Sequence, residues 1–119
     1  MTKELTAAET KDLLVELLLA KKATDVTVIN VSNQTVVTEY FIIATGKSTS
    51  QVKALTEHLE EKGEEKGLFA FRKDGVREAR WVVLDYGSVI VHIFNDATRD
   101  FYALEKLWGN ADNTVVVKD

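Results

Sequence analysis

The sequence predicts an α/β fold, because stretches with the periodicity of amphipathic helices alternate with short runs of β-branched and aromatic residues. The chain has 119 residues, which is the usual size of one domain and long enough to bury a core. We therefore expect one domain over residues 1–110 and a C-terminal tail over residues 111–119. The stretch from Trp81 to Trp108 organises this domain, since it predicts two adjoining strands, a tight turn and a helix.

Composition and charge exclude several functional classes. The sequence contains no cysteine, which excludes disulfides, thiolate metal sites and a cysteine nucleophile. Its formal net charge is −4, and acidic and basic residues are mixed along the chain. Proteins that bind nucleic acid by neutralising phosphates usually carry a basic patch, so we expect no direct nucleic-acid specificity. An acidic surface instead favours encounter with a basic protein partner.

The N-terminal stretch shows neither an import signal nor a membrane span. It is polar and acidic, unlike an arginine-rich transit peptide. Its longest apolar run, residues 13–20, is interrupted by Glu16 and is too short to cross a bilayer. We therefore expect a cytoplasmic protein without a membrane partner.

Local patterns predict the first helix and the first two strands. Thr6 and Glu9 match a capping box, which predicts a helix from there to about Lys22. Residues 24–31 and residues 36–45 are rich in β-branched and apolar side chains and predict two strands. Because the link between them is short and turn-forming, we expect the two strands to pair antiparallel.

The Gly-Lys-Ser triplet at residues 46–48 matches only the end of a phosphate-binding loop. The full motif needs a further glycine at the position of Phe41. Without it the loop cannot cradle phosphate with backbone N–H groups. We expect instead that Ser48 caps a helix over residues 48–62, with Gln51 three residues later.

The segment after this helix predicts a short third strand over residues 68–72 and a turn at residues 73–75. Residues 76–80 are mostly charged, and we expect them to be solvated. His58 lies on the preceding helix without a second His, Asp or Glu at metal-ligand spacing, so no metal site is predicted there.

Residues 81–85 and 89–94 predict the central hairpin of the sheet, because both runs are apolar and only a tight turn separates them. Successive side chains of a strand point to opposite faces. We place Trp81, Val83 and Asp85 on one face of the first strand, and Ile90, His92 and Phe94 on one face of the second. His92 is polar among apolar neighbours, so it needs a hydrogen-bond partner or an exposed position.

A final helix follows, capped by Asn95 or Asp96 and ended by Gly109. Its apolar residues recur at helical spacing and form a core stripe: Ala97, Phe101, Leu104 and Trp108. Near the opposite face lie Arg99, Tyr102 and Lys106. Because tyrosine and arginine are favoured in protein–protein hot spots, this face predicts contact with a partner.

The stretch WVVLDYGSVIVHIF, with the later pattern R-x-F-Y-x-L-E-x-L-W, resembles the signature of the ribosomal silencing factor family, also called the Iojap-like family. Upstream, residues 38–46 with Gln51 and Val52 are similar to the strand–glycine–helix element of that family. The resemblance covers nearly the whole chain. It implies a mixed sheet of about five strands flanked by helices, akin to nucleotidyltransferases without their catalytic residues.

The resemblance also implies a function. Members of this family bind the large ribosomal subunit at ribosomal protein fourteen, block joining of the small subunit and repress translation in starvation. The free protein is expected to be a homodimer. Two residues depart from the family pattern, since Ser88 replaces a usual acid and Glu39 stands where Asp is common. These departures leave open which acidic side chains serve binding.

For the partner-binding surface we select Trp81, Asp85, Tyr86, His92, Arg99, Tyr102 and Lys106. We expect no catalytic residue, no metal and no cofactor, and therefore no enzyme. A nucleotidyltransferase-like enzyme is an alternative. However, its best acids, Asp85 and Asp96, lie at opposite ends of a strand, too far apart to share Mg²⁺. The other alternative is a dimerisation module with a role in large-subunit assembly.

Overall fold

The computed structural model describes residues 5–95, 108–109 and 112–117, and in these residues two helices flank a six-stranded mixed sheet. In chain order the elements are α1 (Ala7–Ala20), β1 (Thr24–Asn30), β2 (Tyr40–Gly46), α2 (Thr49–Glu65), β3 (Arg72–Asp74), β4 (Trp81–Asp85), β5 (Val89–Asn95) and β6 (Thr114–Val116). The predicted α/β fold is confirmed. The sheet has one strand more than the family resemblance implies, because β6 adds an edge strand beside β1.

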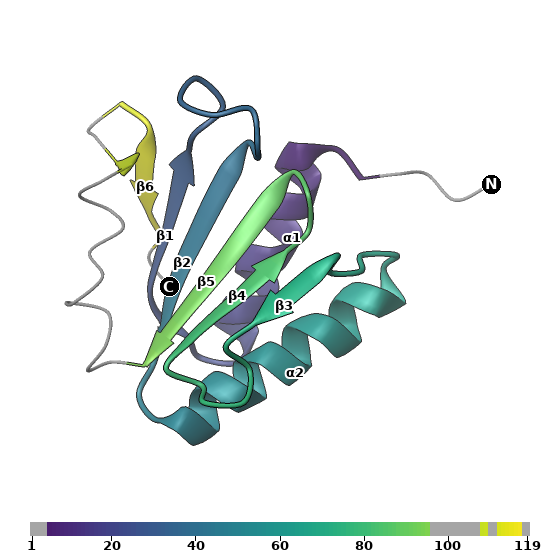
Figure 1. The fold of residues 1–119 in the computed structure, drawn as a ribbon, viewed down its shortest axis with the longest axis vertical. Coiled ribbons are helices and arrows are strands. Elements are labelled where there is room, and N and C mark those ends of the chain that lie inside the picture. The colour runs from purple at the N-terminus through teal and green to yellow at the C-terminus, as the bar shows by residue number, and fades with distance from the viewer. Residues whose placement is uncertain (1–4, 96–107, 110–111, 118–119) are drawn as a thin grey trace.

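The strands lie in the order β3-β4-β5-β2-β1-β6 (Figure 1). β2 and β5 form the central pair and run parallel, whereas the other neighbouring strands pair antiparallel. The predicted hairpin of β4 and β5 is present, with β5 in the centre of the sheet and β4 between β5 and the edge strand β3. The predicted antiparallel pairing of β1 and β2 is also confirmed.

Both helices pack on the same face of the sheet, and the main core lies between them and the strands (Figure 1). Leu14 and Leu18 of α1 and Leu55 and Leu59 of α2 are fully buried there. We call the opposite side of the sheet the distal face. A second buried cluster lies on the distal face and consists of Ile29, Val31, Phe41, Ile43 and Phe94.

Both predicted helix starts are confirmed. The Thr6 side chain accepts a hydrogen bond from the Glu9 N–H at 3.1 Å, and the Thr6 N–H donates to the Glu9 carboxylate at 2.9 Å. Ser48 caps α2 by accepting from the Gln51 N–H at 3.1 Å. These bonds satisfy N–H groups that the first turn of a helix leaves without a partner. Gly46 and Ser48 thus form a strand-to-helix connection, as predicted.

The second strand begins later than predicted, at Tyr40, and residues 36–39 belong to the connection from β1. Val36 and Val37 are exposed, at 103% and 70% of full accessibility. The pairing explains the difference. Asn30 is the last partner of β1 and lies opposite Tyr40, so the intervening residues have no strand beside them. β-branched residues favour a strand only where a neighbouring strand can pack against them.

The third strand is also displaced, from residues 68–72 to Arg72–Asp74. Phe71 donates its N–H to the Asp85 carbonyl, and the ladder with β4 continues from there. The chain reverses at Gly75, which has φ +73°. Of the predicted turn at residues 73–75, only Gly75 therefore lies outside β3.

Gly46 and Gly63 differ in the space that surrounds them. A Cβ on Gly46 would lie 2.8 Å from Val52 Cγ2, whereas a Cβ on Gly63 in α2 would meet nothing closer than 3.5 Å. We expect Gly46→Ala to destabilise the protein by about 1–3 kcal/mol through overpacking. Gly63→Ala should stabilise it by about 0.5–1 kcal/mol, because glycine is costly inside a helix. Urea denaturation of both variants tests this, and effects of the same sign would contradict the described packing.

Candidate functional site

Aromatic side chains gather on the distal face around the start of β4. Trp81 stacks on Phe94 of β5, with ring centroids 5.4 Å apart and an angle of 19° between the planes. Phe41 of β2 meets the His92 ring edge-on at 5.3 Å, and Trp108 meets Phe41 in the same way at 5.3 Å. We call Trp81, Phe94, His92, Phe41 and Trp108 the aromatic cluster. Three strands and the segment at Trp108 contribute to it.

Strand register explains why these residues meet. In the antiparallel hairpin Trp81 lies opposite Phe94, and Val83 lies opposite His92. Directly paired residues point to the same face, so the predicted alternation within each strand places both sets on one side. The parallel register of β2 and β5 then brings Phe41 beside this set.

His92 is the buried polar residue of the cluster, with 8% of its surface exposed. The Trp81 Nε1–H donates to His92 Nδ1 at 3.0 Å. Since Nδ1 accepts, the proton of the neutral ring is on Nε2. That nitrogen is buried and has no hydrogen-bond partner in the described part of the chain. Burial lowers the pKa of His92 to about 4, so the ring is neutral near pH 7.

The pKa of His92 predicts a loss of stability in mild acid. The unfolded chain takes up a proton near pH 6.5, but the folded protein takes it up only near pH 4, so acid favours the unfolded state. The free energy of unfolding should fall by up to about 3 kcal/mol between these two pH values and then lose its dependence on His92. Denaturant titrations from pH 7 to pH 4 measure this loss.

His92→Phe should remove most of that pH dependence, because it deletes the titrating group and retains an aromatic ring. His58→Gln is the matched control, since the other histidine is more exposed. Burial and the nearby Lys21 and Lys62 lower the pKa of His58 as well, so this control should remove a smaller part of the dependence. If the free energy of unfolding changed equally with pH in His92→Phe and in the unmodified protein, the prediction would be contradicted.

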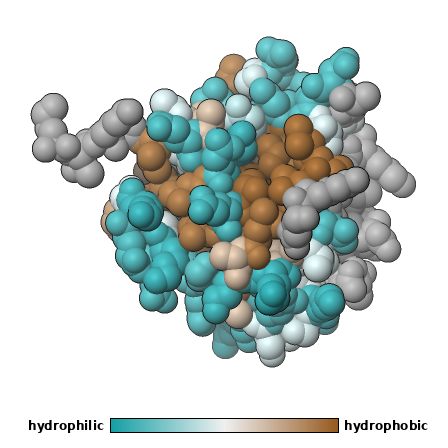
Figure 2. Space-filling model, turned by 180° about the vertical axis from the view of Figure 1, so that it is seen from behind, coloured by the Kyte–Doolittle hydropathy of each residue, from teal (hydrophilic) through white to brown (hydrophobic). Residues whose placement is uncertain are grey.

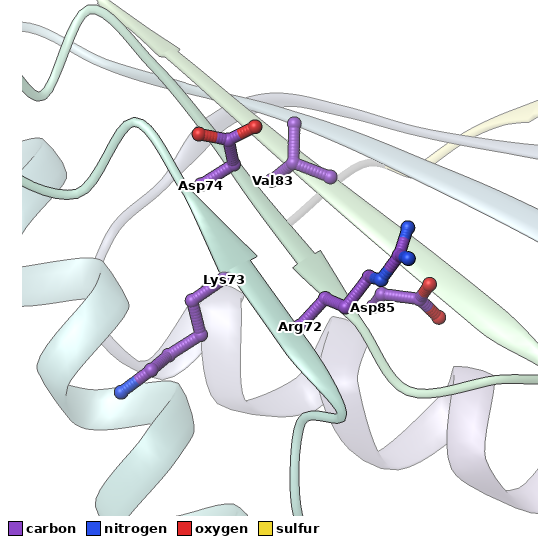
Figure 3. Close-up of a pocket in the computed structure, with 5 residues that line it drawn as sticks. All are labelled: Arg72, Lys73, Asp74, Val83 and Asp85. Carbon is purple, nitrogen blue, oxygen red and sulfur yellow. The ribbon is translucent and has the colours of Figure 1, made fainter.

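Asp85 lies at the other end of β4, on the same face as Trp81. Its Oδ1 accepts a hydrogen bond from the Gly87 N–H at 2.8 Å and so fixes the turn between β4 and β5. Asp85 also lines a surface pocket of about 490 Å³. Figure 3 shows Arg72 of β3 alongside Asp85, with Asp74 and Val83 further along the two strands. Lys73 points the other way, towards α2, and pairs with Glu60 at 3.1 Å.

Tyr86 differs from the other described residues selected from the sequence. It is only 7% exposed and belongs to the main core on the helix side of the sheet, so it does not reach the distal face. Its hydroxyl is buried without a hydrogen-bond partner among the described residues. Burial, with smaller contributions from Glu60 and Glu64, raises the pKa of Tyr86 to about 12. We therefore remove Tyr86 from the candidate partner surface.

Arg99, Tyr102 and Lys106 lie outside the described residues, as do Phe101 and Leu104. Trp108 is described, and it packs against the distal-face cluster as the core stripe predicts. Sequence reasoning missed Phe41 as a member of the site. Its position became visible only through the parallel pairing of β2 with β5, which no local pattern specifies.

A second surface pocket, of about 380 Å³, lies between α1 and the edge strand β6. Val15, Val28, Val115 and Val117 supply its apolar lining. Figure 2 views the molecule from behind and shows an apolar area across the middle of this side, with hydrophilic residues around it. Val115 and Val116 of β6 are exposed. Of these two, Val115 lines the pocket, so this side is also able to bury apolar surface against a partner.

Within the described ranges, no three His, Cys, Asp or Glu side chains gather where they could hold a metal ion. Nor is any described helix long and apolar enough to cross a membrane. The described distal face presents an aromatic cluster with a partly exposed tryptophan, and the Asp85 carboxylate lies on the same face at the other end of β4. The fold defines an α/β protein with a six-stranded mixed sheet, and the distal face carries this aromatic cluster.

Comparison with known proteins identifies the family. The family model described as ribosomal silencing factor during starvation matches residues 4–119. The chain therefore belongs to the ribosomal silencing factor family. The ribosomal silencing factor of Bacillus subtilis is 38% identical over 91 residues, which are 76% of this chain and 77% of that protein. The chloroplastic Iojap protein of Zea mays is 38% identical over 90 residues, which are 76% of this chain and 39% of the maize protein.

A solved structure agrees with the fold. The crystal structure of a Chromobacterium violaceum protein superposes with a TM-score of 0.86 at 33% sequence identity, and the match covers 96% of this chain and 95% of that one. The family resemblance inferred from the sequence is thus confirmed. The name of the Bacillus subtilis relative describes silencing of the ribosome, and neither of the two names describes a chemical reaction.

Proposed function

We propose that this member of the ribosomal silencing factor family binds the large ribosomal subunit at ribosomal protein fourteen and thereby prevents the small subunit from joining. Family membership supports a role at the ribosome, and the particular partner follows the family resemblance of the sequence. Repression of translation under starvation would follow, because unjoined subunits do not elongate. Action on the ribosome makes the cytoplasm the expected location.

The aromatic cluster is the observation that supports a protein partner most directly. Trp81 keeps part of its surface exposed while it is held by stacking on Phe94. Tryptophan, tyrosine and arginine carry much of the binding energy of protein interfaces. We therefore propose Trp81 and Asp85 as partner contacts, and Arg99, Tyr102 and Lys106 remain proposals from the sequence. The net charge of −4 favours approach to a basic ribosomal protein.

Silencing in this proposal is steric. The protein measures 43 × 31 × 27 Å along its principal axes. A domain of this size on the joining side of the large subunit would occupy space that the small subunit needs. The proposal requires binding only, with no reaction, metal or cofactor.

Co-sedimentation with purified ribosomal subunits tests the proposal. The protein should migrate with large subunits and not with small ones, and isolated ribosomal protein fourteen should compete for it. Failure to migrate with large subunits would overturn the proposal. Binding to large subunits without competition by the isolated protein would refute the choice of partner.

We also propose that the free protein forms a homodimer, as the family resemblance implies. The apolar side between α1 and β6 supports this, since Val115 is exposed there on an edge strand. Multi-angle light scattering should give twice the chain mass of 13.3 kDa. Val115→Lys should shift the mass towards one chain if this side forms the interface. A monomeric mass for the unmodified protein would refute the homodimer.

A further inference from the structure

The hydrogen bond between Trp81 and His92 joins an exposed part of the site to a buried one. Trp81 lies at the start of β4 and keeps part of its surface exposed. His92 lies in the middle of β5 with little exposed surface, and its Nε2 has none that water can reach. A partner docking on the distal face can therefore touch Trp81 but cannot bond to the His92 ring without displacing its cover.

Stacking alone does not fix the orientation of the Trp81 ring. The parallel arrangement with Phe94 holds the indole plane, with 19° between the rings. Stacking constrains the plane of an indole and does not by itself specify which edge faces inward. The hydrogen bond removes this freedom, because it is satisfied only when Nε1 points to His92 Nδ1. His92 also stacks beside Trp81, at 5.9 Å and 30°.

We propose that His92 is a positioning residue, whose Nδ1 accepts the Trp81 Nε1–H and so selects the single indole orientation that the partner surface presents. The role of that orientation in partner binding rests on the proposed function, whereas the orientation itself is a property of the free protein. His92 thus contributes to recognition through Trp81 and without contact of its own. The sequence predicts His92 as a partner contact, whereas in this proposal His92 holds the contact residue Trp81 in position.

The acceptor is available because the neutral ring carries its proton on Nε2. No described residue accepts a hydrogen bond from that Nε2–H. A phenylalanine ring at this position would offer no acceptor, so the Trp81 Nε1–H would lose the hydrogen bond that fixes the indole.

The test compares two replacements of His92. His92→Phe keeps an aromatic ring and removes the acceptor, whereas His92→Asn keeps an oxygen acceptor close to the position of Nδ1. The indole N–H resonances in a ¹⁵N correlation spectrum report the orientation, because the chain has only two tryptophans and Trp81→Phe assigns them. The dispersion of the backbone amide signals shows that each variant is folded.

We expect His92→Phe to shift the Trp81 indole signal and to lower the affinity for large ribosomal subunits by about tenfold, the scale of one hydrogen bond. In His92→Asn, both the Trp81 indole signal and the affinity should lie between those of His92→Phe and those of the unmodified protein. In a Trp81→Phe background, His92→Phe should cause no further loss of affinity. An unchanged indole signal in His92→Phe, or an equal loss of affinity in the Trp81→Phe background, would overturn the inference. If the unmodified protein fails to bind subunits, the proposed function fails, and the indole signal alone decides the positioning role.

Discussion

Trp81→Ala is expected to weaken binding to large ribosomal subunits by about 30-fold or more, the loss typical of a tryptophan hot spot. The indole is partly exposed, stacks on Phe94 and is fixed by a hydrogen bond to His92. It therefore offers a partner a large rigid surface that loses little entropy on binding. Fluorescence anisotropy of the labelled protein, titrated with large subunits, measures the affinity.

Phe69→Ala is the matched control, because Phe69 is an exposed aromatic residue that lies outside the aromatic cluster. It should bind within about twofold of the unmodified protein, since a residue outside the interface contributes little. Both variants should keep the thermal unfolding transition expected of a folded domain. Equal affinities for Trp81→Ala and the unmodified protein, with both folded, would show that the distal face around Trp81 is not the contact surface.

Gly75→Ala is expected to have the largest effect on stability, a loss of about 3 kcal/mol or more. A Cβ at this position would lie 2.0 Å from the Trp81 carbonyl oxygen, a distance that only backbone movement can relieve. Gly75 also has φ +73°, which disfavours every residue with a side chain. Because the movement would occur at the start of β4, it would also disturb the placement of Trp81. Chemical denaturation measures the loss.

Gly67→Ala separates the effect of the positive φ from the effect of the steric clash. Gly67 has a similar φ of +85°, but a Cβ there would have nothing within 4 Å. Its loss should therefore be the conformational cost alone, about 1 kcal/mol. If Gly75→Ala lowered the free energy of unfolding by no more than Gly67→Ala does, this would contradict the close approach of Gly75 to the Trp81 carbonyl.

Local chemistry made part of this fold predictable. The capping residues Thr6 and Ser48 specify helix starts through hydrogen bonds to residues three positions away, and both starts are confirmed. The faces of β4 and β5 follow from alternation, which is also a local property. The two strands pair as predicted, with Trp81 and His92 on the same side of the sheet.

The structure differs from the sequence prediction where contacts with residues far away in the chain determine the local structure. Val36 and Val37 have strand-forming side chains but no neighbouring strand, so they lie in a loop. Tyr86 is among the residues proposed from the sequence for the partner surface, yet it is buried on the helix side of the sheet. Phe41 joins the site only through the parallel pairing of β2 with β5, which depends on residues about fifty positions apart. Periodicity within one segment carries no information on such pairings.

The subunit-joining reaction tests the central claim most directly. Purified large and small subunits are mixed at a magnesium concentration that supports joining, and light scattering follows the formation of whole ribosomes. Preincubation of large subunits with this protein should reduce the scattering amplitude in proportion to occupancy, and Trp81→Ala should require about 30-fold more protein for the same effect. An unchanged amplitude with large subunits saturated by the unmodified protein would contradict the proposal that binding blocks subunit association.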